Sequence, residues 1–141
     1  MSIGELLKAT KAGIKSNKIV FSGVGKTEEE ILMAIKKRVL LINVESENEV
    51  NLINKIAQKV SRKIPIGIRL NPNITGKTNK KISTGDKNDK FGLSFNDCII
   101  LCKKISSMKN LKLEGLSVHI GSQITNIEPF RKVLSVLNKI T

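Results

Sequence analysis

The stretch Leu113-Glu-Gly-Leu-Ser-Val-His-Ile-Gly-Ser-Gln123 joins an apolar run to the single histidine of the chain and to a turn of small polar residues. Such a run predicts a β-strand, and His119 stands at its carboxyl end. Parallel α/β proteins bind ligands where the carboxyl ends of strands meet the amino ends of helices. His119 is therefore a candidate ligand-binding residue, with a hydrogen-bonded core histidine as the alternative.

Outward from this stretch, strand-like runs recur at residues 18–22, 39–44 and 64–70. Amphipathic helix patterns lie around them, at residues 4–12, 27–38, 46–63, 95–107 and in a closing segment near Pro129. Strands that follow one another at roughly two dozen residues, each with a helix between, are typical of right-handed βαβ units. The predicted fold class is α/β, with about four parallel strands alternating with helices. A small open sheet and part of a (β/α)8 TIM barrel fit this pattern equally.

Two helix starts carry the sequence of a capping box, Thr27 with Glu30 and Ser46 with Glu49. In that motif the hydroxyl and the carboxylate each accept a hydrogen bond from an otherwise unpaired backbone amide. The run 39–44 is nearly all apolar, which predicts a parallel strand covered on both faces.

The composition predicts an aliphatic core, because 40% of the residues are hydrophobic while Trp and Tyr are absent and Phe occurs four times. A formal net charge of +13 is typical of nucleic-acid binders. The lysines are nevertheless scattered through every segment, and the aromatic residues on which unpaired bases stack are scarce. A solvated lysine surface is the preferred interpretation, with no nucleic-acid partner. We find no apolar segment of membrane-spanning length and no signal-peptide pattern, so the cytoplasm is the expected compartment.

The two cysteines, Cys98 and Cys102, lie four residues apart in a predicted helix. This spacing places both on one face as small core residues, together with Ile99 and Ile105, and indicates neither a metal site nor a disulfide framework. No metal ligand set is predicted.

Several polar residues stand near the predicted strand ends. Arg69 lies near the end of the run 64–70, and burial of its charge requires either a structural ion pair or a ligand. Glu45 follows the run 39–44, where stabilising the amino end of the next helix is the preferred role. The segment Gly23-Val-Gly-Lys26 resembles a phosphate cradle but fits neither the Walker nor the dinucleotide spacing, so turn glycines are expected. The polar segment 71–89 is long enough to be functional or disordered, with ordered turns expected at 82–85 and 90–92.

Six motifs in order carry a resemblance to a known family: Lys18-Ile-Val-Phe-Ser-Gly-Val-Gly-Lys-Thr27, Asn43-Val-Glu-Ser46, Arg69-Leu-Asn-Pro72, Ile82-Ser-Thr-Gly85, Lys90-Phe-Gly92 and His119-Ile-Gly-Ser-Gln123. Over essentially its whole length the chain resembles the middle of the barrel domain of the diaminopimelate decarboxylase family. These are pyridoxal-phosphate enzymes with an alanine-racemase-like barrel that make lysine. The resemblance implies that residues 1–141 are the central part of a (β/α)8 barrel domain, with the first strands, the last strands and a C-terminal β domain absent.

The resemblance also implies roles for three residues. His119 matches the histidine that stacks on the cofactor ring, Ser122 a small polar residue near the cofactor phosphate, and Arg69 a basic residue close to the cofactor. The family's Schiff-base lysine would lie before Met1, so no catalytic residue is expected in the chain. The implied cofactor is pyridoxal 5'-phosphate, the implied substrate meso-diaminopimelate, and the implied assembly a homodimer.

The expected function is a portion of diaminopimelate decarboxylase, which converts meso-2,6-diaminopimelate to L-lysine and CO2, inactive as this chain alone because most anchors of the cofactor are missing. The first alternative is a non-enzyme, either a decayed fragment or the partner of a complementing chain that carries the missing strands. The more distant alternative is a basic RNA-binding module, whose affinity would depend on salt and not on the cofactor.

Overall fold

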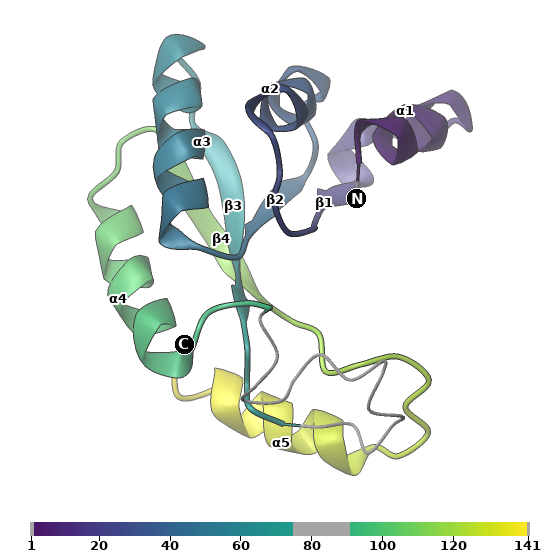
Figure 1. The fold of residues 1–141 in the computed structure, drawn as a ribbon, viewed down its shortest axis with the longest axis vertical. Helices are drawn as coiled ribbons and strands as arrows, with labels where there is room; N and C mark the ends of the chain where they lie inside the picture. The colour runs from purple at the N-terminus through teal and green to yellow at the C-terminus, as the bar shows by residue number, and fades with distance from the viewer. Residues whose placement is uncertain (1, 75–90, 141) are drawn as a thin grey trace.

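The computed structural model describes residues 2–74 and 91–140, which form a parallel sheet covered by helices (Figure 1). The sheet has four strands in the order β1-β2-β3-β4. The elements in chain order are α1 (Ile3–Lys11), a 3-10 turn (Ser16–Lys18), β1 (Val20–Phe21), α2 (Glu28–Lys37), β2 (Leu41–Val44), α3 (Glu47–Lys59), β3 (Ile64–Leu70), α4 (Phe95–Ser106), β4 (Leu111–Val118) and α5 (Glu128–Leu137).

The strand order separates the two architectures that the sequence pattern left open. Each strand pairs in parallel with the next one along the chain. An open doubly wound sheet reverses its strand order at a switch point, whereas a (β/α)8 barrel winds in one direction. The predicted partial barrel of about four parallel strands alternating with helices is therefore confirmed.

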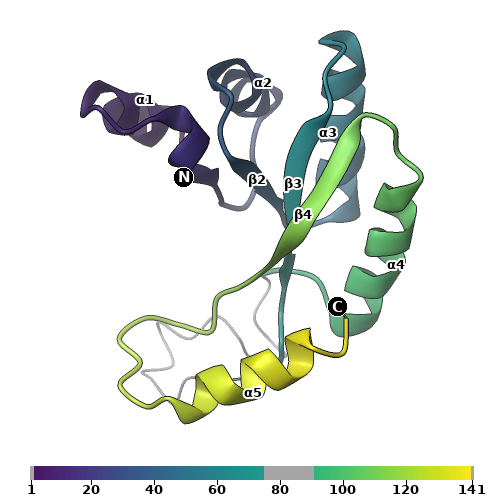
Figure 2. The same cartoon turned by 180° about the vertical axis from the view of Figure 1, so that it is seen from behind.

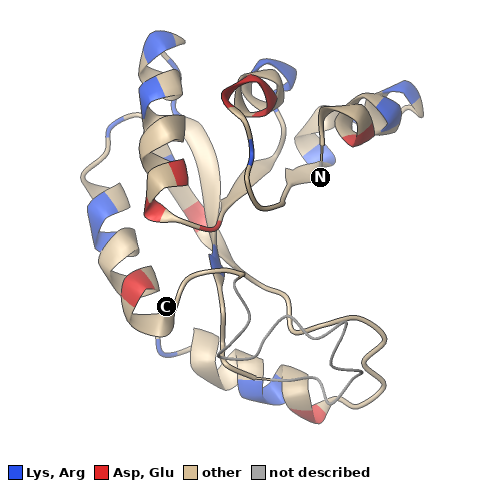
Figure 3. Ribbon diagram, viewed as in Figure 1, with Lys and Arg blue, Asp and Glu red and all other residues tan. Residues whose placement is uncertain are grey.

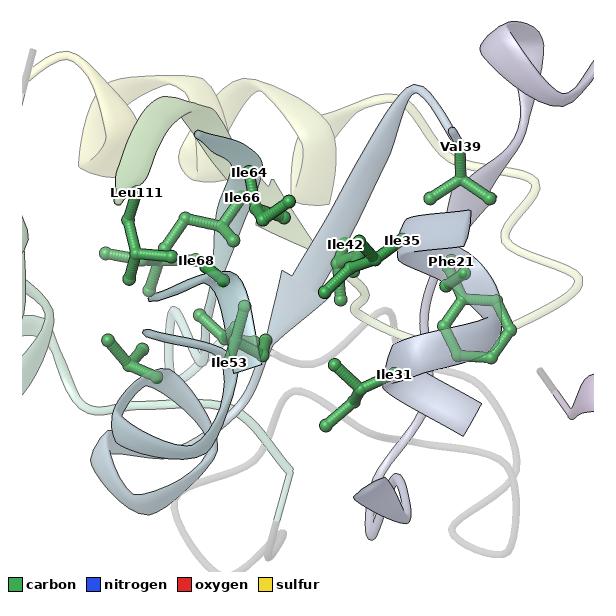
Figure 4. Close-up of a cluster of buried hydrophobic side chains, with 14 of the residues drawn as sticks. Phe21, Ile31, Ile35, Val39, Ile42, Ile53, Ile64, Ile66, Ile68 and Leu111 are labelled. Atoms are coloured by element: carbon green, nitrogen blue, oxygen red, sulfur yellow. The ribbon is translucent and has the colours of Figure 1, made fainter. Parts of the chain in front are cut away.

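One face of the sheet, here called the outer face, packs under the helices. Figures 1 and 2 show α3 in front of the sheet in one view and behind it in the other. The outer face is aliphatic and buried, with Ile42, Ile66 and Ile68 fully inaccessible to solvent. Side chains of α2 and α3 pack on it, as the close-up in Figure 4 shows for Ile31, Ile35 and Ile53. Full burial of each such side chain contributes about 1.5–3 kcal/mol.

The opposite face, here called the inner face, is less completely covered than the outer face among the described residues. On β2 the inner residues are half-buried at Leu41 and 6% exposed at Asn43, so the prediction that the run 39–44 is covered on both faces holds only in part. On β1 the inner residue Val20 is 36% exposed. A short apolar run does not distinguish a strand covered on both sides from one whose inner side faces a barrel interior.

Of the two predicted capping boxes, the one at α2 is complete and the one at α3 is not. Thr27 and Glu30 form a complete capping box at α2. The Thr27 backbone N–H, which donates to the Glu30 carboxylate, lowers the pKa of Glu30 from its usual 4.5. At α3, Ser46 accepts from the Glu49 backbone N–H, but the Glu49 carboxylate binds elsewhere, so the second capping box is only half formed. The α1 helix starts with a complete capping box that the sequence analysis missed, at Ser2.

The α4 helix buries Cys98, Leu101 and Ile105, while Cys102 is half-buried and Ile99 is not part of the buried set. Burial, and after it the neighbouring Cys102 thiol, raises the pKa of Cys98 to about 12. Cys98 is therefore a protonated core residue at neutral pH, as its position in the sequence predicts.

The closing helix α5 packs only partly on the rest of the chain, because Pro129 and Val133 are buried whereas Phe130 and Leu134 are 47% and 59% exposed. The ordered turn expected at residues 82–85 lies outside the described residues. In the described part that follows it, Leu93 forms a parallel bridge to Leu70. No described helix has the length and apolar character needed to cross a membrane.

Candidate functional site

A hollow of about 430 Å³ opens on the inner face where the four strands end. Each strand contributes to it, because parallel strands bring their carboxyl ends to one edge of a sheet. The lining residues are Ser22, Gly23, Asn43, Arg69, Phe91, Ser117, Val118 and His119. Polar residues therefore gather at the edge where (β/α)8 barrels hold their active sites.

Arg69 is the positive charge of this hollow. It belongs to β3, and its Nη1 donates to Glu45 Oε1 at 2.9 Å. The guanidinium carbon lies 5.4 Å from the centre of the Phe91 ring, within the range of a cation-π contact. The side chain of Arg69 is 17% exposed and that of Glu45 is 7% exposed. The ion pair is thus partly shielded from water, which makes its attraction stronger than that of a surface pair.

The backbone of Arg69 is held as firmly as its side chain. Its carbonyl accepts from the Leu93 backbone N–H at 2.8 Å, and the Asn71 N–H donates to the Leu93 carbonyl at 2.8 Å. Gly92 makes this approach feasible, since its φ is +79° and a Cβ there would lie 3.0 Å from the Arg69 carbonyl oxygen. The segment that carries Phe91 is thereby fastened to the end of β3.

Behind the ion pair lies a second one. Lys26 Nζ donates to the Gly23 carbonyl and, at 2.8 Å, to Glu49 Oε1. The side chains of Lys26 and Glu49 are 1% and 9% exposed. The other carboxylate oxygen, Glu49 Oε2, accepts from the Glu45 backbone N–H at 2.9 Å. Lys26 is therefore engaged in the structure, and the segment Gly23-Val-Gly-Lys26 is a braced turn instead of a phosphate cradle.

Asn43 and Ser117 form the polar floor of the hollow. Asn43 Nδ2 donates to Ser22 Oγ at 2.7 Å, which links the ends of β1 and β2. The side chain of Asn43 lies over Gly67, where an added Cβ would stand 2.5 Å from Asn43 Oδ1. Asn43 Oδ1 and Ser117 Oγ are buried and have no hydrogen-bond partner among the described residues. Leaving such an atom unpaired costs about 1–3 kcal/mol, so unpaired polar atoms in a hollow mark a site that expects a ligand, water or further protein.

The three residues singled out from the sequence do not all meet. Arg69 and His119 line the same hollow, from the ends of β3 and β4. His119 is exposed there, as a ligand-facing side chain is and a core histidine is not. Ser122 is also exposed, three residues further along the loop after β4, and is not among the lining residues.

Sequence reasoning missed the roles of four lining or bracing residues. Asn43 is the one polar residue within the apolar run 39–44, and a single polar residue in a buried strand is a signal for a site residue. Ser117 alternates with apolar neighbours on β4, which in hindsight marks the inner face. Lys26 contacts Glu49, and Phe91 contacts Arg69. Both contacts join segments that are distant in sequence, so no local sequence pattern predicts them. Among the described residues, no group of three His, Cys, Asp or Glu side chains could hold a metal ion.

Comparison with known proteins agrees with this geometry. The family described as "Pyridoxal-dependent decarboxylase, pyridoxal binding domain" matches residues 1–141. Diaminopimelate decarboxylase of Aquifex aeolicus is 41% identical over 100% of the chain, and that of Helicobacter pylori is 45% identical over 99% of it. The chain spans about a third of the length of these relatives, 34% and 35% respectively.

Solved structures show the same similarity. The crystal structure of diaminopimelate decarboxylase from H. pylori complexed with L-lysine superposes with a TM-score of 0.94 at 42% identity, over 99% of this chain and 36% of that one. The enzyme from M. jannaschii in complex with L-lysine gives 0.87 at 38% identity, over 99% and 32%. A lysine/ornithine decarboxylase from Vibrio vulnificus, at 17% identity and a TM-score of 0.74, shares the fold. The chain therefore belongs to the pyridoxal-dependent decarboxylases, within their pyridoxal-binding domain.

Proposed function

We propose that the chain forms one arc of the barrel of a diaminopimelate decarboxylase, which converts meso-2,6-diaminopimelate to L-lysine and CO2. The observation that carries the proposal is the hollow at the strand ends, where Arg69, His119 and two unpaired buried polar atoms face one space. The relatives of 41% and 45% identity that bear this enzyme's name support the choice of reaction.

The residues present fit pyridoxal 5'-phosphate. This cofactor is a flat, polar, anionic ring compound, and the hollow offers a flat imidazole, a guanidinium and polar atoms that lack partners among the described residues. His119 would lie against the ring, Arg69 would bind a polar or anionic group of the cofactor, and Ser122 would donate to its phosphate. When bound, the cofactor supplies the electron sink that makes loss of a carboxylate feasible.

The chain's own residues then bind and orient instead of carrying out the bond-breaking step. With the cofactor bound, His119 would lie against one side of its ring and shield that side from water, which strengthens the electrostatic interactions inside. Arg69 offers the positive charge of the hollow and a planar set of N–H donors. No lysine lines the hollow among the described residues, and Lys26 is paired with Glu49. We assign the amine that attaches the cofactor to another part of the barrel.

The remaining expectations belong to the whole enzyme. We propose that it works in the cytoplasm as a homodimer, as its family resemblance implies, or that a complementing chain supplies the other strands. Its inner face and its two edge strands, β1 and β4, have no covering element among the described residues. The other strands of the barrel, from the same enzyme or from a complementing chain, would provide that covering.

A hybrid barrel tests the proposal. Residues 1–141 replace the matching third of H. pylori diaminopimelate decarboxylase, so that the partner segments come from a relative of 45% identity. We expect the hybrid to bind pyridoxal phosphate, measured by absorbance titration, and to form lysine from diaminopimelate. The same hybrid with His119→Ala is expected to bind the cofactor more weakly and to turn over more slowly.

The outcomes separate the alternatives. A hybrid that folds by circular dichroism and gel filtration but binds no cofactor would favour the decayed fragment and contradict the proposal. Salt-sensitive RNA binding by the chain without cofactor binding would favour the RNA-binding module. The Lys and Arg positions are spread over α1, α2, α3, α4 and α5 (Figure 3).

A further inference from the structure

Four charged side chains follow one another from the turn after β1 to the hollow: a lysine, two glutamates and an arginine. Lys26 binds Glu49 at 2.8 Å, Glu49 accepts from the backbone of Glu45 at 2.9 Å, and Glu45 binds Arg69 at 2.9 Å. We call these four residues the charge chain. It connects three separate parts of the sequence, and Arg69 is the member that lines the hollow.

All four side chains of the charge chain are largely buried, Lys26 the most and Arg69 the least. The side chains of Lys26, Glu49, Glu45 and Arg69 are 1%, 9%, 7% and 17% exposed. Burying an unpaired charge this deep carries a large desolvation free energy. In the charge chain, two positive and two negative side chains compensate one another. Glu45, for which a role at the amino end of the next helix was the preferred interpretation, thus also pairs with Arg69 in a largely buried position. It lies beneath Arg69, between that residue and the deeper ion pair.

Glu45 is fixed twice. Its backbone N–H is held by Glu49, and its Oε1 is held by Arg69. Its second oxygen, Oε2, is buried with no hydrogen-bond partner among the described residues. A neutral or apolar side chain would avoid this desolvation cost, and replacement of a buried ion pair by apolar residues is often neutral or stabilising. The charge at this position is better explained by what it does to Arg69.

Arg69 has a long side chain whose free form samples many rotamers. Phe91 limits it on one side, but a cation-π contact leaves the group free to slide over the ring. A carboxylate at 2.9 Å fixes one N–H direction of the planar guanidinium and so sets where its other N–H groups point.

We infer that Glu45 is a positioning residue, which holds the Arg69 guanidinium in the hollow in the orientation that binds the cofactor. This inference rests on the proposed function. It predicts that Glu45 acts on cofactor binding only through Arg69. Without Glu45, the Arg69 guanidinium turns toward water.

A double-mutant cycle in the hybrid barrel tests it. The variants are Glu45→Gln, Arg69→Gln and the pair, and the measured quantity is the dissociation constant of pyridoxal phosphate by absorbance titration. We expect Glu45→Gln to weaken binding about tenfold when Arg69 is present and to have little effect when it is Gln. Glu47→Gln is the matched control, because Glu47 lies two residues away on the surface and pairs with the exposed Lys104.

A second variant separates positioning from folding. Glu45→Asp keeps the charge, so we expect it to retain more cofactor affinity than Glu45→Gln, and it serves alone if Glu45→Gln does not fold. Equal losses in the two Arg69 backgrounds, or affinity unchanged by either Glu45 substitution, would overturn the inference while the hybrid still binds. An unsubstituted hybrid that binds no cofactor would overturn the proposed function and the role of Glu45 with it.

Discussion

The two faces of the sheet are built from neighbouring residues of the same strands and have opposite characters. On β2, Ile42 points outward and is fully buried, whereas Asn43 points inward and lines the hollow. On β3, Ile68 belongs to the core and Arg69 to the charge chain. The period of two along a strand places stability on one face and polar chemistry on the other. Each face can therefore be disturbed with limited effect on the other.

The same contrast separates two helix starts with the same motif. Glu30 closes its own capping box at α2, above the outer face. Glu49 occupies the equivalent position at α3, yet its carboxylate binds Lys26 and the Glu45 backbone instead. Proximity to the hollow has changed the partner of a standard capping residue.

The largest expected effect comes from Glu49→Gln. It leaves Lys26, whose side chain is 1% exposed, without its counter-charge. Loss of one partner of a buried pair costs about 3–5 kcal/mol. We expect that decrease in the free energy of unfolding of the hybrid barrel in urea. Glu30→Gln is the control at the equivalent position and should cost less than about 1 kcal/mol. Similar costs for the two substitutions would mean that Glu49 serves as an ordinary cap.

The outer face is tested by Ile42→Ala. This substitution leaves a cavity under α2, and cavities of this kind cost about 2–5 kcal/mol. Leu41→Ala, one residue earlier on the half-buried inner side, should cost about 1 kcal/mol. Urea unfolding of the two variants measures the difference. A larger loss for Leu41 than for Ile42 would show that the inner face carries the core of the assembled barrel.

A pair of glycines tests the inner face. Gly67→Ala would place a Cβ 2.5 Å from Asn43 Oδ1 and 3.0 Å from Leu41 Cδ2, which forces the hydrogen-bonded Asn43 to move. Overpacking of this kind costs about 1–3 kcal/mol. Its register partner Gly115 has open space around the position of a Cβ, so Gly115→Ala should lie within about 0.5 kcal/mol of the parent. Thermal or urea unfolding compares them, and a neutral Gly67→Ala would show that Asn43 is not fixed.

Periodicity alone was enough for the architecture but not for the site. The run 64–70 matches the bounds of β3, because an apolar run between turn residues is a local signal. The run 39–44 was correctly predicted to be a strand, but how far its inner side is buried depends on what lies opposite. A hydrophobic pattern cannot report a neighbour that is distant in sequence.

The sequence predicted only those site residues whose type is unusual for their position in the chain. His119, alone of its type, and Arg69, a charge at a strand end, were both singled out and both line the hollow. Glu45 was assigned to the next helix, because its partner Arg69 is 24 residues away and nothing local indicates the pairing. Their roles toward a cofactor stay predictions, as does that of Ser122.

The smallest expected effect concerns the cap at α2. Thr27→Ala removes the hydroxyl that accepts from the Glu30 backbone N–H, at a cost of about 1 kcal/mol. The lowered pKa of Glu30 gives the cap a pH dependence. Since the carboxylate is more acidic in the folded protein, its contribution is fully present above pH 4.5 and is lost as the pH falls through the lowered pKa.

Glu30→Gln removes this titration, so its free energy of unfolding, measured in urea from pH 7 to pH 3, should approach that of the parent hybrid at the acid end. Glu29→Gln is the control, because Glu29 lies in the same first turn but has no part in the capping box. A Glu30→Gln curve that stays parallel to the parent at every pH would contradict the cap. The outer-face helix would then be held by packing alone, and the contrast with Glu49 would rest only on the charge chain.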